Sequence, residues 1–309
     1  MKLFEILDKL REKMLELFPQ KSARHIYHYT TSEVLWEFLK PNNDFLCTYC
    51  KALSDPTEFK TGVFAVTRIC QELHIEFTKT LSYMNLLAGV SGNNLWPWVM
   101  SFSIERDDTR QWRTYTSKSS GGYSIGFNVD RITNVLQSFD DRTHDYWALI
   151  SLLPCVYVGH DDQTNIKEFV RYALIDLKPE LKGLLDRNIR REDSAEIADA
   201  LLCFLLSSVI KHKDFREERE WRLIVQPIEL ANVADKCRMV GEKIRISSGL
   251  CEGRMKMSDF IDEIIVSPHG QTENLRAKAE MYAALRRLNN RDGKLIVASE
   301  SSYKGDCRM

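Results

Sequence analysis

The chain has 309 residues, of which 44% are hydrophobic and 28% are charged, which is ordinary usage for a globular protein. This composition excludes a disordered, fibrous or collagen-like chain. The 43 Lys and Arg residues are balanced by 44 Asp and Glu, for a formal net charge of -1. Non-specific nucleic-acid binders usually carry a basic excess, so any nucleic-acid contact here must depend on a local patch.

Hydrophobic periodicity divides the chain into an N-terminal helix and one α+β domain. Residues 1–20 have apolar side chains three and four positions apart, the pattern of an amphipathic helix. Over residues 21–309 we predict a single domain built on a mixed, mainly antiparallel sheet. Within it, residues 130–213 are mostly helical and form an insertion between two halves of that sheet.

Strand and helix patterns alternate along the domain. Strands are expected at 24–30, 45–49, 98–104, 123–127, 149–158, 220–227, 263–266 and 294–298. Helices are expected at 32–40, 54–77 with a continuation over 81–87, 130–139, 165–212 and 272–288, with a short helical turn near 111–115. We expect the strands at 98–104 and 123–127 to pair with each other.

Cysteine spacing and the N-terminal sequence indicate the cellular environment. The eight cysteines lie mostly in apolar segments without a disulfide pattern, so we expect buried free thiols in a reducing cytosol. The N-terminal segment lacks the uninterrupted apolar run of a signal peptide. The longest apolar run, near Ala200–Ile210, is too short to cross a bilayer. We therefore expect a cytoplasmic protein without membrane contact.

Metal and nucleotide motifs are missing from the sequence. It contains no G-x-x-x-x-G-K-[ST] phosphate loop and no G-x-G-x-x-G dinucleotide turn. Cys47 and Cys50 form a lone C-x-x-C that would fall on opposite faces of a strand. No second pair stands at zinc-site spacing and the seven histidines are scattered, so we expect no metal.

Two polar clusters lie on predicted strands. In His28-Tyr29-Thr30, alternation puts the His and Thr on one face, where both could bind a ribose or a carboxamide. The alternative is a satisfied histidine beside a helix cap. Ser101 and Ser103 also share a face, where their hydroxyls either bind a polar ligand or bond across strands.

A third cluster, Gln111-Trp112-Arg113-Thr114-Tyr115, lies on the short helical turn. Trp112 and Tyr115 are three positions apart, so one turn presents both rings for stacking on a planar ligand. Arg113 could meet a phosphate. The alternative is that both aromatic rings pack against the sheet.

A fourth cluster, residues 217–222, combines three glutamates with two arginines at the start of an apolar strand. Glu218 and Glu220 are two positions apart and point the same way. A carboxylate at the rim of a sheet can bond a ribose hydroxyl and stabilise an oxocarbenium-like transition state, as in glycosidic bond cleavage. The alternative is a solvated charged face.

In chain order these motifs resemble a bacterial family of domains of unknown function. The order is H-Y-T, (S/N)-D-P-x-E, S-F-S, Q-W-R-x-Y, G-x-x-I-G-F, E-x-E-W-R-L and E-I-I-V-x-P, from Ile26 to Ser299. That family is itself similar to ADP-ribosyltransferases, which implies a split, mainly antiparallel sheet of their type. Asp55 and Glu58 belong to the family's own signature, and the resemblance implies no transferase role for them.

The resemblance implies a role for each matching residue. His28 and Thr30 would contact the adenosine ribose of NAD, Ser101 and Ser103 match a serine-type variant of the second motif, and an aromatic ring would stack on nicotinamide. Glu220 would be the catalytic carboxylate, and Glu218 would orient the acceptor. The implied NAD-binding residues are His28, Tyr29, Thr30, Ser101, Ser103, Trp112, Arg113 and Tyr115, and the implied catalytic residues are Glu220, Glu218 and His28.

The resulting hypothesis is an NAD-dependent ADP-ribosyltransferase that consumes NAD and needs no metal. Its acceptor would be a protein or a nucleic acid. A bacterial toxin or anti-phage effector of this kind would have a neutralising partner, such as an antitoxin. The alternative is a non-catalytic nucleotide or NAD sensor, or a partner-binding module, on the same fold. The long interval between Tyr115 and Glu220 departs from the family pattern and keeps that alternative open.

Overall fold

The computed structural model of the chain describes residues 2–19, 23–40, 43–53, 58–75, 96–117, 120–138, 148–159, 163–188, 194–228, 234–240, 243–251, 256–270, 272–285 and 295–301. Helices and a mainly antiparallel sheet occur together in these segments, so the predicted α+β class is confirmed. Asp55 and the helix expected over 81–87 lie outside the described residues.

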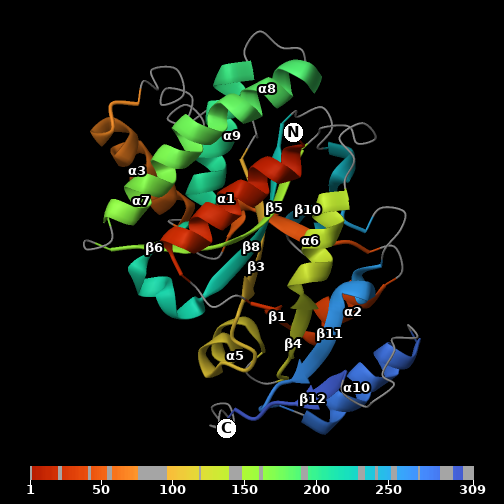
Figure 1. Ribbon diagram of the computed structural model, residues 1–309. Coiled ribbons are helices and arrows are strands. Elements are labelled where there is room, and N and C mark those ends of the chain that lie inside the picture. Colours follow the sequence, from red (N-terminus) through yellow and green to blue (C-terminus); the bar gives the residue numbers. More distant parts are fainter. Residues whose placement is uncertain are drawn as a thin grey trace.

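Ten strands of the described residues form one mixed sheet (Figure 1). From one edge its order is β12 (Ile296–Ala298), β11 (Ile261–Val266), β4 (Tyr123–Asn128), β1 (His25–Thr30), β3 (Trp98–Ser103), β2 (Leu46–Tyr49), β10 (Lys243–Ser247) and β9 (Cys237–Val240). In addition, β8 (Glu220–Pro227) pairs with β3, and β5 (Ala148–Pro154) pairs with β8. The β11–β12 pair is parallel, and the other ladders of this sheet are antiparallel.

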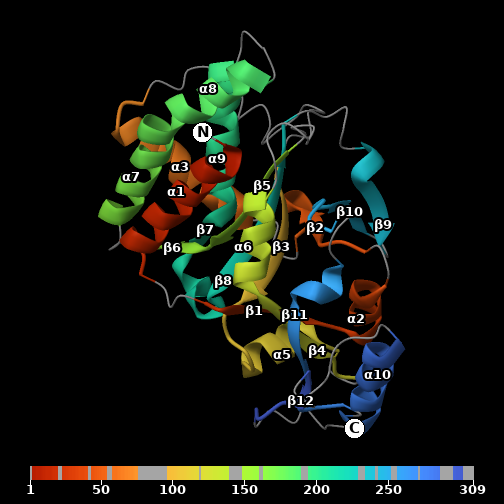
Figure 2. The same ribbon diagram turned by 45° about the vertical axis from the view of Figure 1, so that its right-hand side comes forward.

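Strand β3 divides the sheet into two wings. One edge of β3 pairs with β8 along its whole length, ending where Ser103 lies opposite Glu220. The other edge is shared, because β2 pairs with the start of β3 whereas β1 pairs with it only where Tyr27 meets Ser103. The wing formed by β2, β10 and β9 projects to the right in Figure 2. Beyond Tyr27, the ladder between β1 and β3 is therefore open.

Helices cover both faces of the sheet. The larger core contains side chains from α1 (Leu3–Leu17), α3 (Glu58–Glu72), α7 (Gln163–Arg171), α8 (Lys178–Asn188) and α9 (Ser194–Val209), which lie together in Figure 1. A second core contains side chains from α2 (Ser32–Leu39), α6 (Val129–Ser138) and α10 (Thr272–Leu285). The short helix α5 (Thr109–Tyr115) places Trp112 in a third, smaller cluster with Tyr27 and Tyr29 of β1.

Short elements connect these parts. They are the 3-10 turns η1 (Cys50–Ala52), η3 (Lys213–Glu218), η4 (Ala234–Lys236) and η5 (Met257–Phe260), and the π-helical turn η2 (Tyr172–Leu177) between α7 and α8. Strands β6 (Val156–Val158) and β7 (Ile210–His212) form a separate parallel pair. The pair brings the end of α9 beside β5, which positions the residues that follow α9.

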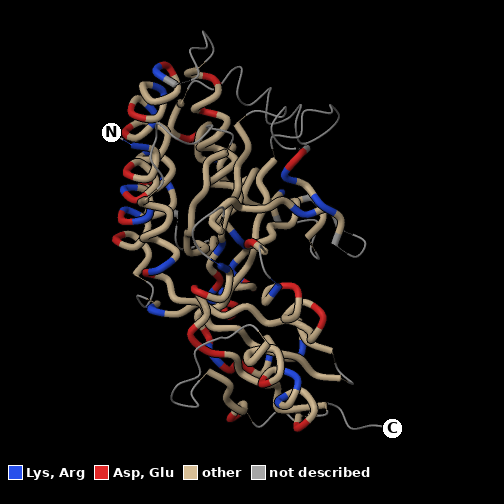
Figure 3. Tube along the Cα trace, turned by 90° about the vertical axis from the view of Figure 1, so that its right-hand side faces the viewer, with Lys and Arg blue, Asp and Glu red and all other residues tan. Residues whose placement is uncertain are grey.

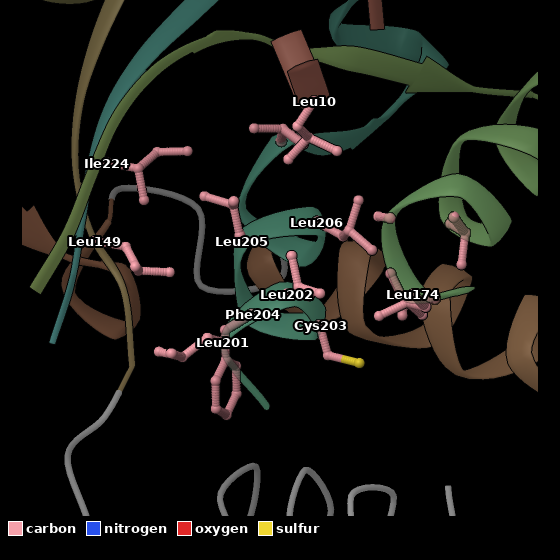
Figure 4. Close-up of a cluster of buried hydrophobic side chains, with 14 of the residues drawn as sticks. Leu10, Leu149, Leu174, Leu201, Leu202, Cys203, Phe204, Leu205, Leu206 and Ile224 are labelled. Carbon is pink, nitrogen blue, oxygen red and sulfur yellow. The ribbon is translucent and has the colours of Figure 1, made fainter. Parts of the chain in front are cut away.

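Helix α9 lies at the centre of the larger core. Its side chains from Ala198 to Val209 are buried, as expected of a helix that is apolar on every side. Ser207 and Ser208 satisfy their hydroxyls by donating to carbonyls four residues earlier, at 2.7 and 2.8 Å. Helix α3 crosses so closely that a Cβ at Gly62 would clash with the Ser207 carbonyl. Figure 4 shows the α9 leucines between the sheet and the neighbouring helices.

The topology corrects one expectation and adds to others. Strands β3 and β4 do not pair with each other, because β1 lies between them. Side-chain alternation specifies the face of a strand but not its neighbour, so local sequence did not reveal this order. The mostly helical segment 130–213 also contributes β5 to the main sheet. The antiparallel pair β9–β10 was not predicted.

Cysteines and charges follow the expectations from composition. The described cysteines, at positions 47, 50, 70, 155, 203, 237 and 251, are free. Cys47 and Cys50 belong to different cores, but only Cys47 lies on β2, because Cys50 begins the turn η1. Lys and Arg are interspersed with Asp and Glu along the outer helices beside the N-terminus (Figure 3). Among the described residues, no helix combines the length and the apolar character needed to cross a membrane.

Candidate functional site

A small pocket lies where β1 and β3 separate. Its volume is about 60 Å³, and the short helix α5 contributes to its wall. The lining side chains come from β1, β3, α5 and the start of β8: Tyr27, His28, Tyr29, Ser101, Phe102, Ser103, Gln111, Tyr115, Glu218 and Glu220. Seven of the residues predicted from sequence thus meet at one place, namely His28, Tyr29, Ser101, Ser103, Tyr115, Glu218 and Glu220.

Three predicted residues are not among the described residues that line this pocket. Thr30 is buried on β1 opposite Tyr123, and Arg113 is exposed on α5. Trp112 is fully buried, donates its indole N–H to Asp107 at 2.6 Å, and packs edge-on against Tyr29 with ring centres 4.8 Å apart. Packing against the sheet, the alternative considered for Trp112, is therefore the arrangement found in the structure.

His28 connects the two strands across the opening. Its Nδ1 lies 2.9 Å from the Ser101 carbonyl oxygen, which only accepts, so Nδ1 carries the proton. The ring packs edge-on against Phe38 and Phe102. Burial lowers the pKa of His28 from 6.5 to about 4, despite the hydrogen bond to Ser101, so the imidazole is neutral at pH 7. A neutral His28 with Nδ1–H has a lone pair on Nε2.

The two serines on β3 have different environments. The Ser103 hydroxyl donates to the Glu218 carbonyl at 2.8 Å and accepts from the Glu105 N–H at 3.1 Å, so it fixes the backbone beside the pocket. The Ser101 hydroxyl has no hydrogen-bond partner among the described residues. Ser101 is therefore the serine whose hydroxyl is open to a ligand, and cross-strand bonding, the alternative considered for the serines, is not seen for the Ser101 hydroxyl among the described residues.

Helix α5 presents two side chains to the pocket because its start is firmly capped. The Asp108 carboxylate accepts from the backbone N–H of Arg110 at 2.7 Å and of Gln111 at 3.1 Å. Gln111 and Tyr115, one turn apart, then line the pocket. Gln111 is only 8% exposed, whereas Tyr115 is 42% exposed.

A cluster of four charged side chains, of which Lys211, Glu220 and Arg222 are buried and Glu218 is partly exposed, forms the carboxylate wall of the pocket. Arg222 binds Glu220 with two N–H groups, Nε to Oε1 at 2.8 Å and Nη2 to Oε2 at 3.1 Å. Lys211, which follows α9, donates from Nζ to Glu218 at 2.6 Å and to Glu220 at 2.5 Å. Arg222 also donates to the Ser208 carbonyl of α9. The charges of the two glutamates and the two cations balance.

These cations determine the charge of Glu220. Burial by itself raises the pKa of a carboxyl group, and this effect is the largest single influence on Glu220. Arg222 and Lys211 together outweigh it and lower the pKa of Glu220 from 4.5 to about 2. The carboxylate is therefore ionised at any physiological pH. The backbone N–H of Glu220 donates to the Tyr157 hydroxyl at 2.8 Å, which anchors the start of β8.

Arg219, between the two pocket glutamates, has a left-handed backbone conformation with φ 43° and ψ 51°. Such a conformation is uncommon for residues other than Gly and often marks functional or strained sites. It turns the chain so that Glu218 and Glu220 line the small pocket. Glu217 and Arg219 line a separate pocket of about 530 Å³ instead.

One further motif match is excluded by its position. Residues Gly122–Gly126 have the G-x-S-x-G spacing of hydrolase nucleophiles. Ser124, however, is fully buried in the middle of β4, and its hydroxyl donates to the Arg106 carbonyl at 3.2 Å. A nucleophile serine needs an exposed turn between a strand and a helix, so this match carries no chemistry.

The structure also adds residues that sequence reasoning missed. Lys211 is 3% exposed, and its position directly after the apolar run that ends at Ile210 is the signal that could have drawn attention to it. Gln111 was noticed only as part of its motif, and Arg222 only as part of a charge run. Within the described segments, no cluster of three or more His, Cys, Asp or Glu side chains could hold a metal ion.

Comparison with known proteins bears on part of the chain. Residues 111–223 match the model of a family described as "Protein of unknown function (DUF2971)". The match begins at Gln111 and ends at Leu223, so it includes α5 from Gln111 onward, Lys211 and the E-x-E-W-R-L motif. No curated protein and no solved structure matches the chain. Similarity to a domain-of-unknown-function family is thereby supported, and the relation to ADP-ribosyltransferases stays a prediction.

Proposed function

We propose that this chain is an NAD-dependent ADP-ribosyltransferase whose reacting site is the small pocket between β1, β3, α5 and the start of β8. One observation carries the proposal. Residues assigned to NAD binding and catalysis by the resemblance lie far apart in sequence, yet they line a single pocket. The pairing of β1 and β8 with β3 brings His28, Ser101 and Glu220, which belong to three separate motifs, to one opening.

The charge state of Glu220 is suited to this reaction. An ionised carboxylate accepts a hydrogen bond from a ribose hydroxyl and stabilises positive charge on the ribose as its bond to nicotinamide breaks. Nicotinamide leaves with the bonding electron pair, and a nucleophilic atom of the acceptor forms the new bond to the same carbon. The acceptor's proton passes to the solvent. Glu218, held by Lys211 beside Glu220, would orient the acceptor.

The pocket size limits what enters. Small-molecule sites usually measure about 300–1,000 Å³, so a pocket of about 60 Å³ has to widen before the reacting end of NAD can enter it. Tyr115 lines the pocket and is partly exposed, so its ring has to move aside or stack over the part that stays outside. The acceptor would be a protein side chain or a nucleic-acid base.

The test uses labelled NAD, a host lysate and two matched variants. Glu220→Gln keeps the shape of the side chain but removes the charge, whereas Glu217→Gln makes the same change at an exposed position facing the other pocket. We expect nicotinamide release and labelling with the wild type and Glu217→Gln, and neither with Glu220→Gln. Glu218→Gln serves as a second variant if Glu220→Gln melts early. Equal turnover by wild type and Glu220→Gln would contradict the proposal.

A second candidate function is NAD or nucleotide binding without turnover. The observation that favours it is that Arg222 and Lys211 already donate three hydrogen bonds to Glu220, so most of the acceptor positions that a ribose hydroxyl would use are occupied. Titration calorimetry separates the two functions. Binding of NAD without release of nicotinamide supports the binding module, and binding with release supports the transferase.

A further inference from the structure

The pocket contains an amide, that of Gln111, which has no hydrogen-bond partner among the described residues. Gln111 is 8% exposed and lines the pocket, and its side chain makes no hydrogen bond with any described residue. Buried side-chain amides are nearly always hydrogen-bonded, to protein, water or ligand. The Gln111 amide is therefore placed to bind a group that enters the pocket.

The other walls restrict the chemistry of that group. The carboxylates of Glu218 and Glu220 only accept hydrogen bonds, and the Ser101 hydroxyl either donates or accepts. No lysine or arginine is among the described side chains that line the pocket, so a phosphate or carboxylate that entered it would face the glutamate oxygens rather than a cation. Because an amide both donates and accepts, its natural complement is a second, uncharged amide, which forms two hydrogen bonds with it.

We propose that Gln111 is a specificity-determining residue that recognises a primary carboxamide. This inference rests on the proposed function, under which the carboxamide is that of the nicotinamide ring of NAD. The pocket then distinguishes NAD from its analogue with nicotinic acid in place of nicotinamide. In that analogue a carboxylate replaces the amide, so both N–H donors are lost and a negative charge faces Glu218 and Glu220.

Titration calorimetry with the full chain tests this recognition. NAD and its nicotinic acid analogue are titrated into the wild type, Gln111→Met and Thr114→Ala. Met matches Gln in length but neither donates nor accepts in the same way, and Thr114 is an exposed position on the same helix. Thermal melting of each variant shows whether α5 remains folded, and Gln111→Glu is the second variant if Gln111→Met is not stable.

We expect the wild type and Thr114→Ala to bind NAD at least about tenfold more tightly than the analogue, since each 1.4 kcal/mol is a tenfold change in affinity. Gln111→Met should bind NAD about tenfold more weakly and lose most of the preference. Equal affinity of the wild type for both ligands, or an unchanged preference in Gln111→Met, would overturn the role of Gln111 but leave the transferase proposal standing. Failure to bind either ligand would overturn both.

Discussion

Replacing Lys211 by Met tests whether the buried charge cluster stabilises the protein. Lys211 is 3% exposed and its Nζ bonds both Glu218 and Glu220. In the wild type two cations balance two carboxylates, whereas the variant has only Arg222 against the buried Glu220 and the partly exposed Glu218, a net charge of -1. Removing one partner of a buried ion pair usually costs about 3–5 kcal/mol. We expect a loss of stability of that size.

The pKa of Glu220 provides a separate measure of the same effect. The difference between 4.5 and about 2 corresponds to about 3 kcal/mol of net stabilisation of the ionised form by Arg222 and Lys211 together. Unfolding entropy of about 2.1 cal/mol/K per residue gives roughly 0.65 kcal/mol per degree for 309 residues. A loss of about 3–5 kcal/mol then lowers the melting temperature by about 5–8 °C.

The pH dependence identifies the cause. Because the folded pKa of Glu220 is depressed, its stabilising contribution is present above pH 4.5 and is lost as the pH falls from 4.5 towards 2. In Lys211→Met, protonation of a glutamate at higher pH relieves the excess negative charge. The difference in melting temperature between wild type and variant should therefore be larger at pH 7 than at pH 4.

The assay is thermal unfolding followed by circular dichroism at both pH values. Lys213→Met is the matched control, because Lys213 is exposed only two residues further along, and a surface change of this kind usually alters stability by less than about 0.5 kcal/mol. If Lys211→Met had the same melting temperature as the wild type at both pH values, the charge cluster would not stabilise the fold and the prediction would be refuted.

Two further predictions concern the pocket walls. Asp108→Ala removes the cap of α5 and should lower the free energy of unfolding, measured with urea, by about 1 kcal/mol. Asp108→Asn keeps a capping oxygen and should lose little stability. Equal losses in the two variants would contradict the capping role. His28 has a folded pKa of about 4 against 6.5, so the stability it contributes is present above pH 6.5 and is lost as the pH falls towards 4. Between pH 7 and 5 this loss of unfolding free energy should be about 2 kcal/mol. The loss should vanish in His28→Gln but persist in His212→Gln, where the histidine is exposed. If the unfolding free energy of His28→Gln fell with pH as steeply as that of the wild type, the prediction would be refuted.

Much of the local structure was predictable from the sequence because its causes are local. The apolar stripe of residues 3–17 produces α1, and the apolar run after Glu220 produces β8 over the predicted range. The motif residues also proved informative, because seven of those predicted line one pocket. Alternation on β3 placed Ser101 and Ser103 on one face, opposite Phe102, without any knowledge of neighbouring strands.

Only the tertiary structure decided the strand order and the environment of the site. Nothing in the sequence of β3 indicates that β8 takes one edge while β1 and β2 share the other, since pairing depends on contacts distant in sequence. The opening that forms the pocket follows from that sharing. Lys211 becomes a partner of Glu220 because β7 follows α9 beside β6.

The burial and the charge of each site residue likewise depend on the residues that folding places beside it. Trp112 and Tyr115 stand on the same helical turn, yet one is fully buried against Tyr29 and the other is partly exposed at the pocket. Glu220 was recognised from its position before an apolar strand, but its charge depends on two cations brought by folding. The sequence by itself determined the elements and the candidate residues, whereas burial and charge came from long-range packing, because desolvation and Coulomb interactions depend on distance in space.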